Sequence, residues 1–363
     1  MNAHIILLPG DGIGPEVTGA AHRVLTQVGF LGKHNFTFAT HLIGGCSIDA
    51  SGVALTQEVL ALCAGADAVL LGAVGGPRWD DPGAPVRPEQ GLLALRKGLS
   101  LYANIRPVKP HPLLLDATPL KPAYVKDVDV LVLRELTGGL YFGKPRGRDE
   151  TGGRLRAFDT MEYYEYEIRR ILELAFRLAG KRKKKVTSVD KANVLESSRL
   201  WRQVAIDVAL GFPGIALEHM LVDTASMRLI SRPAGFDVLV TENMFGDILT
   251  DEASVLAGSM GLLPSASIGD GGPGVYEPIH GSAPDIAGKG CANPVGAILS
   301  SALLLRHSLH LETEAEAVER AVDRAIADGF RTADINGTHG TEEVTEAIVK
   351  RIQLGQGGRS DGN

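Results

Sequence analysis

Cysteine is scarce in this sequence. The 363 residues include three cysteines, Cys46, Cys63 and Cys291, which are widely separated and never occur in C-x-x-C spacing. An odd number of cysteines in this arrangement predicts neither a disulfide framework nor a zinc site. Because structural disulfides belong to oxidising compartments, we expect the chain to work in the reducing cytoplasm.

Long apolar runs and an excess of positive charge are also missing. The apolar run at 5–8 is too short for a signal peptide, and the run at 295–305 is interrupted by two serines. The net charge of −6 argues against nucleic acid as the main partner. The basic run at 181–185 follows Gly180 at the end of an expected helix, where cations complement the helix dipole. We therefore expect a cytoplasmic protein that binds neither nucleic acid nor membrane.

Aromatic residues make up only 5% of the chain, whereas glycine occurs 44 times. This composition is typical of an α/β enzyme with aliphatic strands and many turns, and the length favours two domains. Strand-like runs alternate with helical ones, which predicts a largely parallel sheet covered on both sides. The expected strands lie within 4–10, 66–74, 128–135, 184–191, 215–223 and 235–243. A helix is expected between 162 and 179, where apolar residues recur at helical spacing.

Four charged residues lie at or just after the ends of these strands: Arg134, Lys191, Asp223 and Asp247. Ligands of open α/β sheets bind beyond the carboxyl ends of strands, so this placement predicts a site. Asp247 and Asp251 are four residues apart, which puts both carboxylates on one helix face, and such hard oxygen ligands suit Mg²⁺ or Mn²⁺. Each residue alone could instead cap a helix or form a surface ion pair, and an isolated D-x-x-x-D is more often a solvated face.

Two further segments have distinct patterns. Residues 137–158 are rich in glycine and arginine without a helical period, which predicts a projecting two-stranded arm that pairs with a second copy of the chain. Residues 355–363 are expected to form a tail without regular structure. The opening glycines at 10–14 do not follow the G-x-G-x-x-G pattern, so a standard Rossmann dinucleotide fold is disfavoured.

Seven motifs occur in an order that resembles the isocitrate/isopropylmalate dehydrogenase family of decarboxylating β-hydroxyacid dehydrogenases. They lie at 7–17, 87–107, 134–147, 188–195, 242–254, 261–269 and 277–294. The resemblance runs from about Ile5 to about His307. It implies the isopropylmalate dehydrogenase-like fold, in which two α/β domains share a central sheet. The first domain would comprise 1–101 and 259–363, and the second 102–258 with the dimer interface and the arm at about 137–158.

The resemblance also implies the reaction, the oxidation of a 2-hydroxy acid by NAD followed by loss of CO₂. It implies a homodimer in which Lys191 and Asp223 serve the site of the neighbouring subunit, and K⁺ as an activator. The implied catalytic residues are Tyr141, Lys191 and Asp223, and the implied metal ligands are Asp223, Asp247 and Asp251. The implied substrate-binding residues are Glu89, Leu92, Leu93, Arg96, Arg106, Arg134, Asn193 and Val194. The implied cofactor-binding residues are Ile13, Glu277, His280, Gly281, Ser282, Ala283, Asp285 and Asn293.

The identity of the substrate has sequence support of its own. Glu89, Leu92, Leu93 and Arg96 would share one helix face, which places an apolar patch beside a carboxylate-binding arginine. This patch fits an isopropyl group, although a leucine pair is more often part of a core. D-malate, tartrate and homoisocitrate, which lack an isopropyl group, remain alternative substrates. The alternative outside the enzymes is a non-catalytic regulatory subunit. Such a subunit should lack catalytic groups, whereas Lys191, Tyr141 and the three aspartates are all present in this chain.

Overall fold

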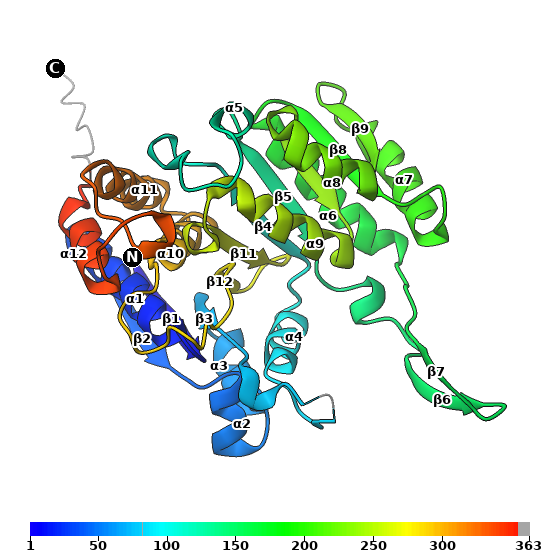
Figure 1. Cartoon of the computed structure of the whole chain (residues 1–363), viewed down its shortest axis with the longest axis horizontal. Helices are drawn as coiled ribbons and strands as arrows, with labels where there is room; N and C mark the ends of the chain where they lie inside the picture. The colour runs from blue at the N-terminus through cyan, green and yellow to red at the C-terminus, as the bar shows by residue number, and fades with distance from the viewer. Residues whose placement is uncertain (82, 355–363) are drawn as a thin grey trace. The chain divides into compact units, whose positions relative to one another are not determined.

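The computed structural model describes residues 1–81 and 83–354, and the predicted tail at 355–363 lies outside this range. Ten strands form one mixed sheet in the order β2-β1-β3-β12-β11-β4-β5-β10-β8-β9, and a separate pair, β6 and β7, forms a two-stranded ribbon (Figure 1). The mixed α/β class with a large central sheet confirms the predicted fold class. The chain divides into two compact units, residues 1–99, 260–266 and 272–363 in unit 1, and residues 100–259 and 267–271 in unit 2.

Unit 1 contains the parallel strands on either side of the chain's first strand. β1 pairs in parallel with β2 and β3, and β12 pairs in parallel with β3. The strands assigned to this unit are β1 (Asn2–Gly10), β2 (Asn35–Thr40), β3 (Ala68–Ala73), β12 (Gly274–Pro278) and most of β11 (Pro264–Ile268). Its helices are α1 (Gly14–Gly32), α2 (Gly45–Ser51), α3 (Gln57–Ala64), α4 (Glu89–Gly98), α10 (Val295–His307), α11 (Glu312–Ala327) and α12 (Thr341–Arg351).

The apolar run at 295–305 forms the buried helix α10. This helix packs against α1, α11 and β12, so most of its surface faces protein, and Ser300 and Ser301 bond to carbonyls of their own helix. Burial on several sides explains the lack of a polar face. Within residues 1–81 and 83–354, every helix is too short or too polar to cross a membrane.

Unit 2 is built around β5, whose six residues are all buried, as expected for a strand covered on both faces. β5 pairs in parallel with β10, β10 with β8, and β8 with β9, whereas β4 and β5 are antiparallel. The strands are β4 (Ala103–Val108), β5 (Val130–Glu135), β8 (Lys185–Asp190), β9 (Ala216–Leu221) and β10 (Val238–Thr241). The helices are α5 (Pro122–Val125), α6 (Glu165–Gly180), α7 (Glu196–Ala209), α8 (Val222–Ser231) and α9 (Asn243–Ser254).

The helix expected at 162–179 is α6, and its apolar stripe forms part of the core of unit 2. Six residues of the stripe are fully buried: Ile168, Ile171, Leu172, Ala175, Phe176 and Ala179. The helix begins at Glu165, because the Glu167 carboxylate accepts a hydrogen bond from the Tyr164 N–H and so caps the first turn. This prediction is confirmed.

The projecting arm is shorter than the segment 137–158. Its strands β6 (Gly147–Thr151) and β7 (Arg154–Phe158) are antiparallel, and Figure 1 shows them as a ribbon that extends away from the helices of unit 2. Residues 139–141 form a short 3₁₀ turn instead of a strand. Leu155 is 88% exposed on the ribbon, the highest exposure of any large apolar side chain among the described residues.

Candidate functional site

Two arginines from neighbouring strands face two aspartates on helix α9. In the antiparallel pairing of β4 with β5, Asn104 lies opposite Arg134, and Arg106 lies two residues further along the same face. The Arg134 guanidinium forms an ion pair with Asp247. Arg106 donates to the Thr250 hydroxyl at 2.8 Å and to the Asp251 carboxylate at 3.3 Å. Because Asp247 and Asp251 are one helical turn apart, each carboxylate meets a different strand.

Tyr141 completes this cluster. Its hydroxyl donates to Asp247 Oδ2 at 2.6 Å, and its ring lies 5.5 Å from the centre of the Arg134 guanidinium. Burial and then the hydrogen bond to Asp247 raise the pKa of Tyr141 to about 12. The phenol is therefore neutral near pH 7 and retains a proton that it can donate.

Lys191 and Asp223 form a second pair in unit 2. They follow the adjacent parallel strands β8 and β9, and Lys191 Nζ donates to Asp223 Oδ1 at 2.9 Å. This hydrogen bond to Lys191 is the main cause of the lowered pKa of Asp223, an exposed carboxyl group. Asn193 and Val194 are exposed in the turn between β8 and α7.

The three aspartates predicted as metal ligands are not gathered within one chain. Among residues 1–81 and 83–354, no three His, Cys, Asp or Glu side chains form a group that could hold a metal ion. Asp247 and Asp251 supply two hard oxygen ligands on one helix face, which suits Mg²⁺ or Mn²⁺, but they fit such an ion only with further ligands. Asp223, which is paired with Lys191, is not part of this group.

The predicted substrate residues of unit 1 lie on and beside α4. Arg96 is 7% exposed and donates to Glu277 Oε1 at 2.8 Å, whereas Glu89 is exposed. Within the described chain, the buried Arg96 Nε has no hydrogen-bond partner. Leu95 supplies the fully buried contact of this helix, while Leu92 and Leu93 are only half-buried. The leucine pair is therefore not part of the core.

The predicted cofactor-binding residues of unit 1 lie mainly in one loop, which packs against the opening glycines. Ile13 N–H donates to the Ser282 carbonyl at 2.8 Å. Gly12 has a φ of +60°, and a Cβ on it would lie 1.9 Å from that same oxygen, so no larger residue fits. Gly281 is exposed, and Ala283 has a φ of +39°. Asn293 accepts from Val295 N–H and donates to Asp334.

His280 and Asp285 of this loop have unused polar atoms. His280 Nδ1 lies 2.9 Å from the Gly281 carbonyl, and its Nε2 is buried without a partner in the described residues. Burial lowers the pKa of His280, which favours the neutral form of the ring. Asp285 is exposed, and its side chain forms no hydrogen bond or ion pair with any described residue. An orphaned ring nitrogen and an unpaired carboxylate fit the polar groups of a nucleotide.

Sequence reasoning missed the residues that hold the arginines in place. Asn104 Oδ1 accepts from Arg106 Nε at 2.7 Å, and Asn243 Oδ1 accepts from Arg134 Nε at 3.0 Å. Asn104 is in the motif at 87–107 and Asn243 precedes the D-x-x-x-D pair, but an asparagine gives no sequence signal of its own for such a role.

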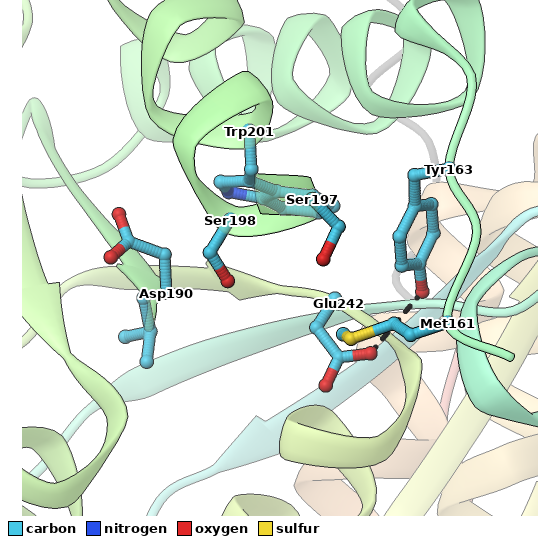
Figure 2. A pocket seen from close by; sticks show the side chains of 8 residues that line it. Met161, Tyr163, Asp190, Ser197, Ser198, Trp201 and Glu242 are labelled. Atoms are coloured by element: carbon cyan, nitrogen blue, oxygen red, sulfur yellow. Dashed lines mark hydrogen bonds between the residues drawn. The ribbon is translucent and has the colours of Figure 1, made fainter. Parts of the chain in front are cut away.

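Unit 2 also has a hollow that none of the predicted site residues lines. Its walls are Met161, Tyr163, Val189, Asp190, Ser197, Ser198, Trp201 and Glu242, most of which Figure 2 labels. It is too tight to admit a water molecule. The hollow therefore marks imperfect packing between the end of β8, the start of α7 and the residues that precede α6 and α9, and it lies apart from the charged cluster of Arg106, Arg134, Tyr141, Asp247 and Asp251.

Comparisons with known proteins identify the family. The sequence matches the family described as isocitrate/isopropylmalate dehydrogenase over residues 4–348. The 3-isopropylmalate dehydrogenase of Anaeromyxobacter dehalogenans is 68% identical over 97% of this chain and 100% of that protein. The enzyme of the same name from Geobacillus kaustophilus is 58% identical over 97% of this chain and 95% of its own.

A solved structure agrees with this result. The isocitrate dehydrogenase of Methylococcus capsulatus superposes with a TM-score of 0.86 at 34% identity, covering 96% of this chain and 99% of that chain. The similarity in both sequence and structure spans nearly the whole chain. This chain therefore belongs to the isocitrate/isopropylmalate dehydrogenase family of decarboxylating dehydrogenases.

Proposed function

We propose that the chain oxidises (2R,3S)-3-isopropylmalate with NAD and releases CO₂ and 4-methyl-2-oxopentanoate, as a step of leucine biosynthesis. The half-buried leucine pair one turn from Arg96 carries this choice of substrate. An apolar patch of this kind stabilises an isopropyl group, whereas isocitrate or homoisocitrate would require a polar partner for a third carboxylate. The 3-isopropylmalate dehydrogenases that share 54–68% of its residues support the same choice.

Arg96, Arg106 and Arg134 bind the two substrate carboxylates in this proposal. Each of the three arginine residues is buried, and a planar fork of donors matches a carboxylate. Arg106 and Arg134 are already neutralised by Asp251 and Asp247, so they are held in place without an isolated buried charge.

The remaining groups of unit 2 move protons. Lys191 takes the proton of the C2 hydroxyl from its neutral amine form and becomes an ammonium as hydride leaves C2 for NAD, and Asp223 orients its Nζ. After CO₂ is lost, the Tyr141 phenol donates its proton to C3. A bound Mg²⁺ or Mn²⁺, held by Asp247, Asp251 and Asp223 of a second subunit, would act as a Lewis acid toward the substrate oxygens. K⁺ is proposed as an activator on family resemblance alone.

A homodimer accounts for the separation of the carboxylates. In the Lys191–Asp223 pair, the Asp223 side chain is 59% exposed. Within the described residues of one chain, no group of three or more His, Cys, Asp or Glu side chains could hold a metal ion. The ribbon of β6 and β7 exposes Leu155, and pairing with a second ribbon would cover it. We therefore propose that each active site takes Lys191 and Asp223 from the other subunit.

A substrate panel tests the proposed reaction. NADH formation would be followed with 3-isopropylmalate, D-malate, tartrate, homoisocitrate and isocitrate, each with Mg²⁺ or Mn²⁺. We expect the highest kcat/KM with 3-isopropylmalate. A higher kcat/KM with any other acid of the panel would refute the proposed substrate, and no turnover of any acid would indicate a non-catalytic member.

The preference for NAD rests on Asp285. A carboxylate can accept hydrogen bonds from the ribose hydroxyls of NAD and repels the 2′-phosphate of NADP. The double variant Asp285→Lys, Ile286→Tyr should lower the ratio of kcat/KM for NAD over NADP. Glu58→Lys makes the same charge change at an exposed position on α3 and serves as the control. Efficient use of NADP by the unmodified enzyme would show that Asp285 does not select the cofactor.

A further inference from the structure

A buried polar network lies behind the charged cluster of unit 2. It joins three parts of the chain: the start of α9, the turn at 138–141 that carries Tyr141, and the segment before α6. Asn243 is 1% exposed and Tyr163 is 8% exposed, so neither can contact a ligand in solution directly. Polar groups at this depth are stable only when they are hydrogen-bonded, and these are.

The Asn243 side chain joins Arg134 to the turn. Its Oδ1 accepts from Arg134 Nε at 3.0 Å and from Arg134 Nη2 at 2.9 Å, while its Nδ2 donates to the Gly138 carbonyl at 3.2 Å. This orientation of the amide is required, because a guanidinium can only donate and a carbonyl can only accept. Asn243 thus fixes one edge of the guanidinium and leaves Nη1 toward Asp247.

The Tyr163 hydroxyl joins the start of α9 to the same turn. It accepts from Asn243 N–H at 2.9 Å and donates to Glu242 Oε2 at 3.3 Å, the contact that Figure 2 marks. Glu242 caps α9 by accepting from the N–H groups of Met244 and Phe245. The Tyr163 ring also packs directly on the turn, since a Cβ on Gly138 would lie 2.5 Å from it.

We propose that Asn243 and Tyr163 are positioning residues, which hold Arg134 and the Tyr141 turn in the geometry that binds the substrate. The inference rests on the proposed function, because it assigns Arg134 to a substrate carboxylate. Asn243 acts on the arginine directly. Tyr163 acts indirectly. Its hydroxyl holds the backbone of Asn243, and its ring packs on the glycines that precede Tyr141.

The experiment measures KM for 3-isopropylmalate and for NAD separately. Asn243→Ala should raise KM for 3-isopropylmalate about tenfold or more, the effect of losing hydrogen bonds to a charged group, and leave KM for NAD near its unmodified value. Tyr163→Phe should act in the same direction but less strongly. It removes one oxygen and keeps the ring, so it remains informative if Asn243→Ala does not fold.

A double-mutant cycle separates positioning from general stability. Arg134→Lys keeps the positive charge but loses the planar pair of guanidinium donors. Adding Asn243→Ala to this variant should therefore raise KM for 3-isopropylmalate little further. Equal effects of Asn243→Ala in both backgrounds would overturn the inference. Tyr276→Phe is the matched control, because its hydroxyl is also buried and pairs with Ser308 Oγ at 2.8 Å in unit 1. It should lower the melting temperature without changing KM for 3-isopropylmalate.

Two further outcomes are decisive. Variants of Asn243 and Tyr163 that lose melting temperature like Tyr276→Phe and keep their KM would show a structural role only, against the inference. If the unmodified enzyme prefers another acid of the panel, the proposed substrate is wrong while the inference stands or falls on KM for that acid. The two failures are therefore distinguishable.

Discussion

Single side chains divide the proposed chemistry between two proton transfers. Lys191 and Tyr141 belong to different ion-pair groups, the first with Asp223 and the second with Asp247 and Arg134. In the proposed dimer the two residues of one site come from different subunits, because Lys191 follows β8 of one chain and Tyr141 lies in the turn after β5 of the other. Different positions allow the two residues to act on different atoms of the substrate.

Substitution of each residue should impair a different half-reaction. Lys191→Met should lower the rate of hydride transfer from the hydroxy acid about 10²-fold or more, because the base is removed. Tyr141→Phe should spare hydride transfer and slow turnover of the keto acid formed by oxidation. Single-turnover NADH formation and CO₂ release from the keto acid would be measured separately. Near-normal hydride transfer by Lys191→Met would remove this lysine from the mechanism.

At the scale of elements, sequence patterns predicted six strands of the large sheet, β1, β3, β5, β8, β9 and β10, and the helix α6, but not the hydrogen-bond partners of their side chains. The stripe on α6 and the D-x-x-x-D face on α9 follow from helical spacing alone, so both could be read from the sequence. β4 could not, because Pro107 lies within it, and its antiparallel pairing with β5 departs from the expected parallel sheet. The roles of Asn243 and Tyr163 depend on three segments that meet only in the folded chain.

Helix α4 should set the preference among substrates. Leu92→Ala with Leu93→Ala shortens the two half-buried side chains and leaves the buried Leu95 in place. We expect the preference for 3-isopropylmalate over D-malate to fall by about 1–3 kcal/mol per lost contact, as judged from the ratio of their kcat/KM values. Val53→Ala, an exposed apolar residue of unit 1, is the control. An unchanged ratio would place the apolar pocket elsewhere.

At the scale of the whole molecule, activity should require two chains. Lys191→Met and Arg96→Ala each inactivate one chain, but a mixed dimer would hold one site with neither substitution if Lys191 comes from the other subunit. Mixing the two inactive proteins should therefore restore part of the NADH-forming activity. Subunit exchange would be verified by mass spectrometry. No recovery after exchange would mean that every chain supplies its own Lys191.

The stability of the folded chain should decline in mild acid. Burial lowers the pKa of His22, His219 and His280, so the unfolded chain takes up protons below about pH 6.5 that the folded chain does not. The free energy of unfolding should thus fall as pH decreases through this region and be insensitive to these groups above about pH 7.5. Urea unfolding at pH 8 and at pH 5.5 would measure it. His219→Gln should reduce the difference between the two pH values, and an undiminished difference would contradict this account.

The ion pairs between α9 and the strands β4 and β5 have a thermodynamic consequence. Under the proposed site, the substrate carboxylates compete with Asp247 and Asp251 for Arg134 and Arg106, while the metal competes with these arginines for the aspartates. Either ligand alone would leave one charge of each pair without its partner, whereas both together neutralise all four. The proposed site therefore predicts that metal and substrate bind with positive cooperativity, each raising the affinity of the chain for the other by the same factor.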